Sequence, residues 1–418
     1  MNKYFTGLIL FLIFLGIYIW GSFARIPFAD CVGFVLTVEK GEYVTTATAT
    51  SHFLYVNTAI AIKDIFGLNG IEANRILVLF SAALSVVFVY YSVLSLKANV
   101  ITSVVAATIF GLSFSFWRNA EIPEVYSYNC LWISLFFLSV IRSFYTEKKI
   151  YIILSGIFLG ISLWLHIQNI LLILGFLIFI YFMRKDRKEA VLSFFIFSIF
   201  FISLFILNYF QGLPINSPYS SDQGQWVEDS FKKTLIQYLS DFVKSIFYVI
   251  YNYTIFIFFG IIGIITLFKN NREMFFVFLV SSFFVYGFST FYAVTDNYVF
   301  FLPFNIIFAI AIGYGMMHRQ KIFRKISFAV ILIPLFYIFS YFIVGQTNKG
   351  KAFNDFKSYK GGLSYYLLPW MNDNKGILEF IIDKKTAPEP VNWMTISAEE
   401  YAEVLKSKGY TDKEIREF

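Results

Sequence analysis

The chain has 418 residues, of which 58% are hydrophobic, 21% aromatic and only 15% charged. Because soluble domains carry about 25% charged residues, this composition excludes a soluble enzyme, a disordered chain and a disulfide scaffold. The formal net charge of +7 does not indicate a nucleic-acid partner, since no basic patch alternates with exposed aromatic residues. The sequence indicates an all-α polytopic protein embedded in the lipid bilayer.

Eleven apolar blocks follow one another along the chain, each close to the roughly 20 helical residues that cross a hydrocarbon core. They predict about eleven transmembrane helices. A shorter apolar stretch, Phe53–Ile62, contains Asn57, and we expect it to form a re-entrant or interfacial helix. The eleven blocks are Tyr4–Trp20, Ile76–Leu96, Val100–Trp117, Val125–Ile141, Ile150–Leu165, Ile167–Met183, Val191–Phe210, Ile246–Phe268, Met274–Val294, Val299–Met317 and Ile326–Val344.

The loops between these blocks alternate in charge. The set that begins at the N-terminus holds fifteen basic and four acidic residues, whereas the opposite set, up to Val344, holds eight basic and twelve acidic residues. Short loops rich in Lys and Arg stay on the cytoplasmic side. We therefore expect a cytoplasmic N-terminus and, after an odd number of crossings, an outer C-terminus. The bias toward Phe, Ile and Lys hints at an AT-rich bacterial genome, which would make the outer side the periplasm.

Two regions are predicted, a transmembrane domain over residues 1–345 and an extracytoplasmic tail over residues 346–418. The first outer loop, residues 21–75, is far longer than an ordinary helix connection, and turn residues fill the 214–225 stretch of a second outer loop. In the tail, Ser397 with Glu400 and Thr411 with Glu414 resemble helix-capping boxes. A tail of this size buries little surface by itself, so we expect it to rest on the outer loops.

Polar residues gather at the outer ends of the predicted spans. Few charges lie inside the spans, which argues against an ion-coupled transporter. The outer residues that could carry chemistry are Asp30 after the first span, Arg118, Glu121 and Glu124 between the third and fourth, His166 between the fifth and sixth, and Asp296 before the tenth.

Each of these residues also has a simpler structural explanation. Glu121 and Glu124 flank Pro123 at a helix start, where Pro and acidic residues are favoured. The explanations for the others are an interfacial anchor for Arg118, a satisfied polar residue for His166, and a turn or helix end for Asp30 and Asp296. Cys31 and Cys130 match no zinc, haem or redox spacing, and the sequence does not decide whether they pair.

Three segments carry a resemblance to a known family: SFWRNAEIPEVYSYN, GISLWLHIQNILLI and VTDNYVFFLPFNIIFAIAIGYG. With an acid after the first span and a long first outer loop, they resemble the GT-C glycosyltransferases, closest to the branch whose animal member O-mannosylates plexin-type domains. The resemblance aligns Asp30 with the first-loop acid, and Glu124, Tyr126 and Asn129 with a second motif. His166 and Asp296 match later motifs. Two departures are the absence of Glu among residues 30–33 and the sequence ATSHFLYVN in place of a Pro-rich stretch.

The resemblance implies transfer of a sugar, possibly mannose, from a polyprenyl-phosphate carrier to an extracytoplasmic acceptor, with Ser/Thr hydroxyls of secreted or membrane proteins favoured. Such a transfer needs a base, for which Asp30 is the candidate, and cations for the leaving phosphate, with Arg118 first and Arg75 second. We expect Glu124 and His166 to bind the sugar or orient the base, with Glu121, Tyr126, Asn129 and Asp296 as further substrate-binding residues.

No cofactor is predicted, because a divalent metal between Asp30 and Glu124 has no diagnostic ligand spacing in its support. Two alternatives remain open: transfer to a lipid or cell-surface glycan, and a flippase or other transporter of lipid-linked sugars without bond chemistry.

Overall fold

The computed structural model describes residues 2–219, 226–294 and 296–418, and every regular element in these ranges is a helix. The part of the predicted turn stretch at residues 220–225 lies outside the described residues. In the first half of the chain, the helices are α1 (Lys3–Gly21), α2 (Cys31–Lys40), α3 (Phe53–Phe66), α4 (Gly70–Ser95), α5 (Val100–Gly111), α6 (Phe114–Asn119), α7 (Tyr126–Tyr145), α8 (Ile150–Leu163), η1 (Ile167–Leu172), α9 (Ile173–Phe182), η2 (Met183–Asp186), α10 (Arg187–Phe210) and η3 (Ser217–Tyr219).

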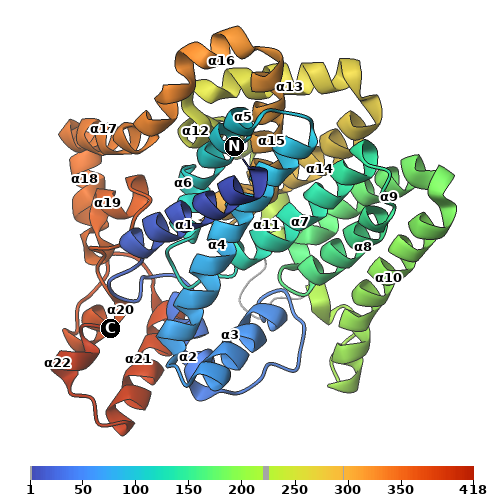
Figure 1. The fold of residues 1–418 in the computed structure, drawn as a ribbon. Coiled ribbons are helices and arrows are strands. Elements are labelled where there is room, and N and C mark those ends of the chain that lie inside the picture. Colours follow the sequence, from blue (N-terminus) through green and yellow to red (C-terminus); the bar gives the residue numbers. More distant parts are fainter. Residues whose placement is uncertain (1, 220–225, 295) are drawn as a thin grey trace.

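The second half continues in the same way and ends in short helices (Figure 1). Its elements are α11 (Trp226–Phe231), α12 (Leu235–Tyr253), η4 (Thr254–Phe256), α13 (Ile257–Asn270), α14 (Arg272–Phe291), η5 (Asn297–Phe301), α15 (Leu302–His318), α16 (Gln320–Ile326), η6 (Ser327–Leu332), α17 (Ile333–Gln346), α18 (Asn348–Phe356), η7 (Ser358–Lys360), α19 (Gly362–Leu367), α20 (Ile377–Ile382), α21 (Asn392–Ser407) and α22 (Asp412–Ile415).

Eight helical segments among the described residues are long and apolar enough to cross a membrane, and two shorter apolar helices, α5 and α8, accompany them. Each of the eleven predicted blocks lies largely in helix. The 44-residue segment from Ile167 to Phe210 holds two of those blocks, joined by η2. The membrane character is therefore confirmed, while the count of about eleven spans stays a prediction.

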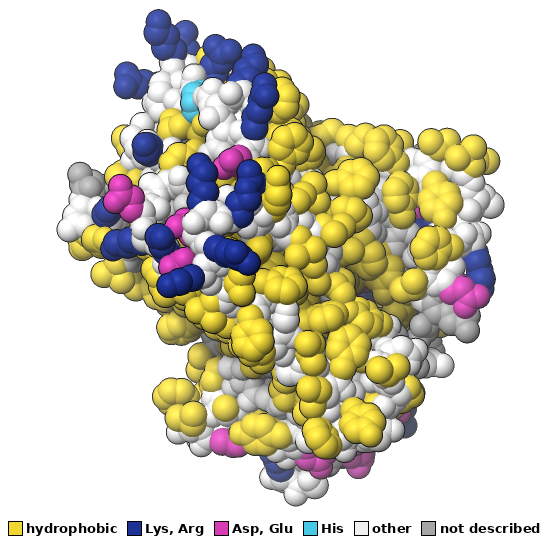
Figure 2. Space-filling view, turned by 90° about the vertical axis from the view of Figure 1, so that its right-hand side faces the viewer, with side chains coloured by type: hydrophobic (Ala, Val, Ile, Leu, Met, Phe, Trp, Pro, Cys, Tyr) yellow, Lys and Arg dark blue, Asp and Glu magenta, His cyan; other side chains and the backbone are white. Residues whose placement is uncertain are grey.

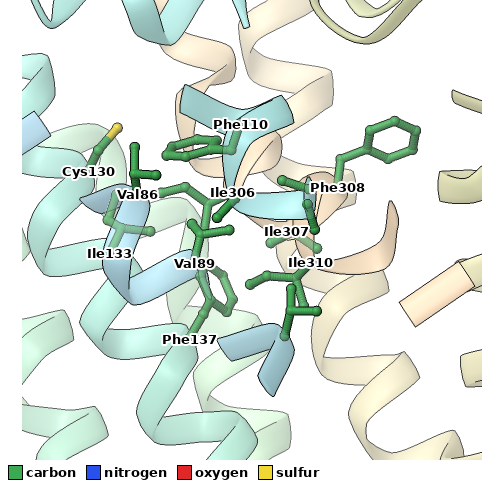
Figure 3. Close-up of a cluster of buried hydrophobic side chains, with 14 of the residues drawn as sticks. Val86, Val89, Phe110, Cys130, Ile133, Phe137, Ile306, Ile307, Phe308 and Ile310 are labelled. Carbon is green, nitrogen blue, oxygen red and sulfur yellow. The ribbon is translucent and has the colours of Figure 1, made fainter. Parts of the chain in front are cut away.

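The core is centred on α15, which is buried along almost its whole length and packs against α4, α5, α7, α13 and α14. Figure 3 shows this packing: Val86 and Val89 of α4, Phe110 of α5 and Phe137 of α7 converge on the α15 side chains from Ile306 to Ile310. Both cysteines are buried and free, so they form no disulfide.

The outer surface of the bundle suits lipid. On α10, large hydrophobic side chains point outward along the helix, among them Phe195, Ile199, Ile202 and Ile206. In Figure 2, hydrophobic side chains cover much of one face, and Lys and Arg side chains gather in its upper left part. This separation of an apolar belt from a basic end is typical of a multi-pass membrane protein.

Helices α2, α3 and α20–α22 form a layer at one end of the bundle, at the bottom of the view in Figure 1. The tail rests on the first loop there, as expected. Lys40 of α2 pairs with Glu400 at 2.6 Å, and Arg25 pairs with both Glu379 at 3.2 Å and Glu417 at 2.5 Å.

The prediction of a helix start at Ser397 is wrong, because α21 already begins at Asn392. Met394, Ala398, Tyr401 and Leu405 recur at helical spacing and are all buried, so packing extends the helix past the local capping signal. The second box is confirmed: the Thr411 side chain and Glu414 cap α22 reciprocally.

Candidate functional site

A cavity of about 1860 Å³ lies between the first outer loop, the connections α6–α7, α8–η1 and α14–η5, helix α12 and the tail. It brings together six of the nine predicted site residues. The cavity is bordered by Asp30, Arg118, Glu124, Tyr126, His166 and Asp296.

Asp30 stands directly before α2, where it makes no side-chain hydrogen bond to cap the helix. Its side chain is accessible from the cavity although protein surrounds it closely. Burial, followed by the negative charge of Asp296, raises the pKa of Asp30 to about 6. The role of a simple helix cap is therefore not supported for this residue.

Glu124 lies one residue before the N-cap of α7 and is almost fully buried. The Cys31 thiol donates to Glu124 Oε1 at 3.5 Å. Burial raises the pKa of Glu124 well above its ordinary value, and the charges of Asp30 and Asp296 raise it further, against hydrogen bonds from Cys31 and the Asp30 backbone. Glu124 thus favours the protonated form, which can donate a hydrogen bond.

Arg118 lies in the last turn of the short helix α6, and a break in the helix at Leu112 and Ser113 separates α6 from α5. Two distant hydroxyls stabilise this break: Tyr18 donates to Gly111 O and Tyr337 donates to Leu112 O, each at 2.9 Å. Because of this break, the predicted span Val100–Trp117 consists of two helices, α5 and α6.

The Arg118 side chain is only 2% exposed, so it is not a lipid-facing anchor. Its guanidinium donates to Tyr365 O at 2.7 Å and to Leu368 O at 3.3 Å. The guanidinium also lies over the Tyr365 ring, 4.3 Å from its centroid. Arg118 is therefore held by the tail while it borders the cavity.

His166 lies between the rings of His52, Tyr126 and Phe300, at centroid distances of 5.2, 5.7 and 5.6 Å. Its Nδ1 accepts from the Gln168 backbone N–H at 3.3 Å. Burial, and then the neighbouring His52, lowers the pKa of His166 well below its ordinary value. One ring nitrogen of the neutral imidazole thus has a hydrogen-bond partner in the neighbouring backbone, and the side chain also borders the cavity.

Asp296 occupies a turn before η5 and is exposed to the cavity. Close surrounding protein raises its pKa, against the attraction of Lys360. Together with Asp30 and Glu124 it makes an acidic group on one side of the cavity, to which Arg118 and Lys360 add positive charge.

The other three predicted site residues do not border the cavity. Arg75 donates to Phe23 O at 2.8 Å and stacks on the Phe23 ring at 4.3 Å. Glu121 accepts from the Trp117 indole at 2.5 Å, and Asn129 accepts from Asn169 at 2.6 Å. The partners of all three, Phe23, Trp117 and Asn169, do not border the cavity either.

The sequence interpretation missed the contribution of the tail. The segment KSYKGGLSYY, residues 357–366, supplies five aromatic or basic side chains to the cavity lining. Its alternation of Lys and Tyr is a signal that could have been noticed. His52, in the first loop, was also missed as a lining residue. The tail residues are Lys357, Tyr359, Lys360, Tyr365 and Tyr366.

Among the described residues, no group of three or more His, Cys, Asp or Glu side chains is arranged to hold a metal ion.

Comparisons with known proteins connect this architecture to a family. Residues 47–190 match the family described as the N-terminal domain of the protein O-mannosyl-transferase TMEM260. This segment includes Arg118, Glu124 and His166. A search of the curated proteins found no significant match.

Solved structures of low sequence identity share the fold. ArnT from Cupriavidus metallidurans matches with a TM-score of 0.55 in the apo state and 0.51 when bound to undecaprenyl phosphate, at 13% identity. These matches cover 84% of this chain and 67% and 68% of the ArnT chains. The oligosaccharyltransferase of Archaeoglobus fulgidus, in complex with zinc and sulfate, matches with a TM-score of 0.50 at 14% identity, over 84% of this chain and 56% of that chain.

The resemblance noted in the sequence is therefore confirmed. Residues 47–190 are similar to the N-terminal domain of the TMEM260 protein O-mannosyltransferases, and the chain shares the fold of the ArnT and oligosaccharyltransferase structures, which together support a multi-pass membrane glycosyltransferase.

Proposed function

We propose that this enzyme transfers a sugar, with mannose as the first candidate, from a polyprenyl-phosphate carrier to Ser/Thr hydroxyls of secreted or membrane proteins. The family description supports mannose and a protein acceptor, and the undecaprenyl phosphate bound to ArnT supports the carrier. We further propose that it resides in a bacterial inner membrane, with the N-terminus in the cytoplasm and the tail, residues 346–418, as a separate region in the periplasm.

One observation carries the proposal: an accessible carboxylate, Asp30, borders the same cavity as Arg118, a cation for which the described residues offer no carboxylate partner. A base and a phosphate-binding cation are the two groups that such a transfer requires. The cavity volume of about 1860 Å³ leaves room for a sugar phosphate together with an acceptor segment.

The proposed step forms one bond and breaks one. The acceptor hydroxyl attacks the anomeric carbon while its proton passes to the Asp30 carboxylate. The bond between the anomeric carbon and the phosphate oxygen breaks, and the carrier leaves as polyprenyl phosphate, whose charge Arg118 stabilises.

The surroundings of the two neighbouring acids support this division of roles. With a pKa of about 6, Asp30 is ionised at neutral pH and remains basic enough to accept a proton. Glu124, whose pKa burial raises well above its ordinary value, suits a hydrogen bond to a sugar hydroxyl. Environments that give two neighbouring carboxyl groups different pKa values are typical of acid and base pairs in enzymes.

We assign the rest of the lining to the sugar. Tyr126 and His166 present aromatic faces beside Glu124, where a sugar ring can stack and form hydrogen bonds. Asp296, on the connection between α14 and η5, is a second polar contact. Arg75, Glu121 and Asn129 were predicted to bind substrate, but we propose that they position the lining residues.

The direct test uses the purified full-length protein with a polyprenyl-phosphate mannose and a Ser/Thr-containing acceptor peptide. We expect equal amounts of released polyprenyl phosphate and glycosylated peptide. Release that occurs only with a lipid or glycan acceptor would change the acceptor class. Movement of the intact donor across a proteoliposome membrane without any release would indicate a flippase.

A further inference from the structure

The tail is fixed to the cavity by hydrogen bonds from three separate regions. Arg118 donates to the backbone oxygens of Tyr365 and Leu368, and Tyr251 of α12 donates to Leu367 O at 2.8 Å. In return, the Tyr365 hydroxyl donates to Phe28 O of the first loop at 2.9 Å. Helix α19 is therefore a part of the cavity wall.

This wall places Lys360 on the cavity. The neighbouring Lys357 pairs with Glu389 at 2.5 Å, and Tyr359 also donates to Glu389, so this carboxylate is already engaged. Among the described residues, no hydrogen-bond or ion-pair partner is found for Lys360 Nζ. It lies instead among three tyrosine rings, those of Tyr359, Tyr365 and Tyr366, at 5.6, 5.4 and 5.2 Å from their centroids.

Lys360 and Arg118 approach the same ring. The Arg118 guanidinium is 4.3 Å and the Lys360 ammonium 5.4 Å from the Tyr365 centroid. The Arg118 charge lowers the pKa of Lys360, whereas the engaged Glu389 and the more weakly acting Asp296 raise it. Burial and the two positive neighbours lower the pKa of Lys360 to about 8.

Two partly buried cations that repel each other cost free energy in the empty protein. An anion bound between them would remove this cost, and a phosphate group offers oxygens to both a guanidinium and an ammonium. Sugar hydroxyls or a neutral peptide would not compensate the charge.

We propose that Lys360 and Arg118 together bind the phosphate of the lipid-linked donor, so that the C-terminal tail supplies half of the phosphate site. This inference rests on the proposed function and adds to it a second phosphate-binding residue. It also assigns the tail a direct part in binding the donor.

The test measures binding, not transfer, with the detergent-purified full-length protein and three ligands: a polyprenyl phosphate, the matching polyprenol, and inorganic phosphate. Removal of one charge-assisted contact is expected to weaken polyprenyl-phosphate binding about ten-fold or more in Lys360→Met. Lys360→Arg should keep most of the affinity. The exposed Lys351 of α18 provides the matched control, and Lys351→Met should bind as the wild type does.

Polyprenol should bind equally to the wild type and to Lys360→Met. Unchanged polyprenyl-phosphate affinity in Lys360→Met would overturn the proposal, as would an equal loss for polyprenol, which would show that Lys360 acts only through packing. If inorganic phosphate competes at the wild-type site but not in Lys360→Met, the head group alone is recognised, which also supports the proposal. A wild type that binds both lipids equally would instead refute the donor class of the proposed function.

Discussion

Asp30 and Glu124 show how two acids from different connections of the chain come to lie in different surroundings. The Cys31 thiol, adjacent to Asp30, donates to Glu124, so the two carboxyl groups share one corner of the cavity. Asp30 is accessible and Glu124 is buried. The difference in burial, not the residue type, makes Asp30 the stronger candidate for the base.

Replacement of Asp30 by Asn should remove the proton acceptor and keep the shape of the side chain. We expect the transfer rate to fall about a hundred-fold or more, with unchanged abundance and thermal stability. The rate is measured as released polyprenyl phosphate per unit time. The exposed Asp355 of α18 supplies the control, and Asp355→Asn should leave the rate unchanged. Near-normal transfer by Asp30→Asn would exclude Asp30 as the base.

The raised pKa of Asp30 predicts a pH profile. Only the ionised carboxylate accepts a proton, so the rate should fall on the acidic side of about pH 6 and level off above it. The measurement is kcat/KM between about pH 5 and 8. The inflection should vanish in the residual activity of Asp30→Asn, and its persistence there would assign it to another group.

At the residue scale, the sequence predicted the acids and Arg118 because each stands in a short polar connection between apolar blocks. The protonation of these residues could not be predicted, since burial depends on segments far along the chain. Arg118 illustrates this: its partners, Tyr365 and Leu368, are about 250 residues away.

Among the elements, α13 and α15 owe their contact to glycines. A Cβ atom on Gly315 would lie 2.0 Å from Phe259 O, and one on Gly263 would lie 1.9 Å from Ala311 O. Small residues on both helices therefore allow the backbones to approach closely, as in other membrane helix pairs.

Gly315→Ala should force these two helices apart and lower stability by about 1–3 kcal/mol. Thermal unfolding of the purified protein in detergent measures the effect. In α14, Gly287 is the matched control because a Cβ atom there meets nothing within 4 Å. Gly287→Ala should be neutral or slightly stabilising. Equal melting temperatures for the two variants would show that the α13–α15 contact is not tight.

The elements also show where local sequence signals suffice. The Thr411 box starts a helix because α22 is short and little packing competes with its cap. The Ser397 box does not, since the buried face of α21 runs through it from Met394. The break between α5 and α6 could not be predicted from its own residues, because hydroxyls of Tyr18 and Tyr337 satisfy the freed carbonyls.

For the whole molecule, the apolar blocks were sufficient to predict an all-helical membrane fold, and the likeness to the GT-C glycosyltransferases came from the resemblance of three polar segments. A run of apolar residues predicts a helix that is buried or faces lipid, and this can be recognised from the residues of the run alone. The tail carries no such strong pattern in residues 357–366, so its place on the cavity follows from tertiary contacts alone. The sequence could therefore predict half of the cation pair, Arg118, but not Lys360.

The orientation of the molecule gives the last prediction. Lys321 of α16 and Lys413 of α22 are both exposed, and the charge bias places them on opposite sides of the membrane. Because Cys31 and Cys130 are buried, the wild type should label weakly with a membrane-impermeant maleimide. In spheroplasts, Lys413→Cys should label directly, whereas Lys321→Cys should label only after permeabilisation. Labelling of both without permeabilisation would mean an even number of crossings between the two positions, and would place the basic end that carries Lys321 on the outer side, against the positive-inside rule.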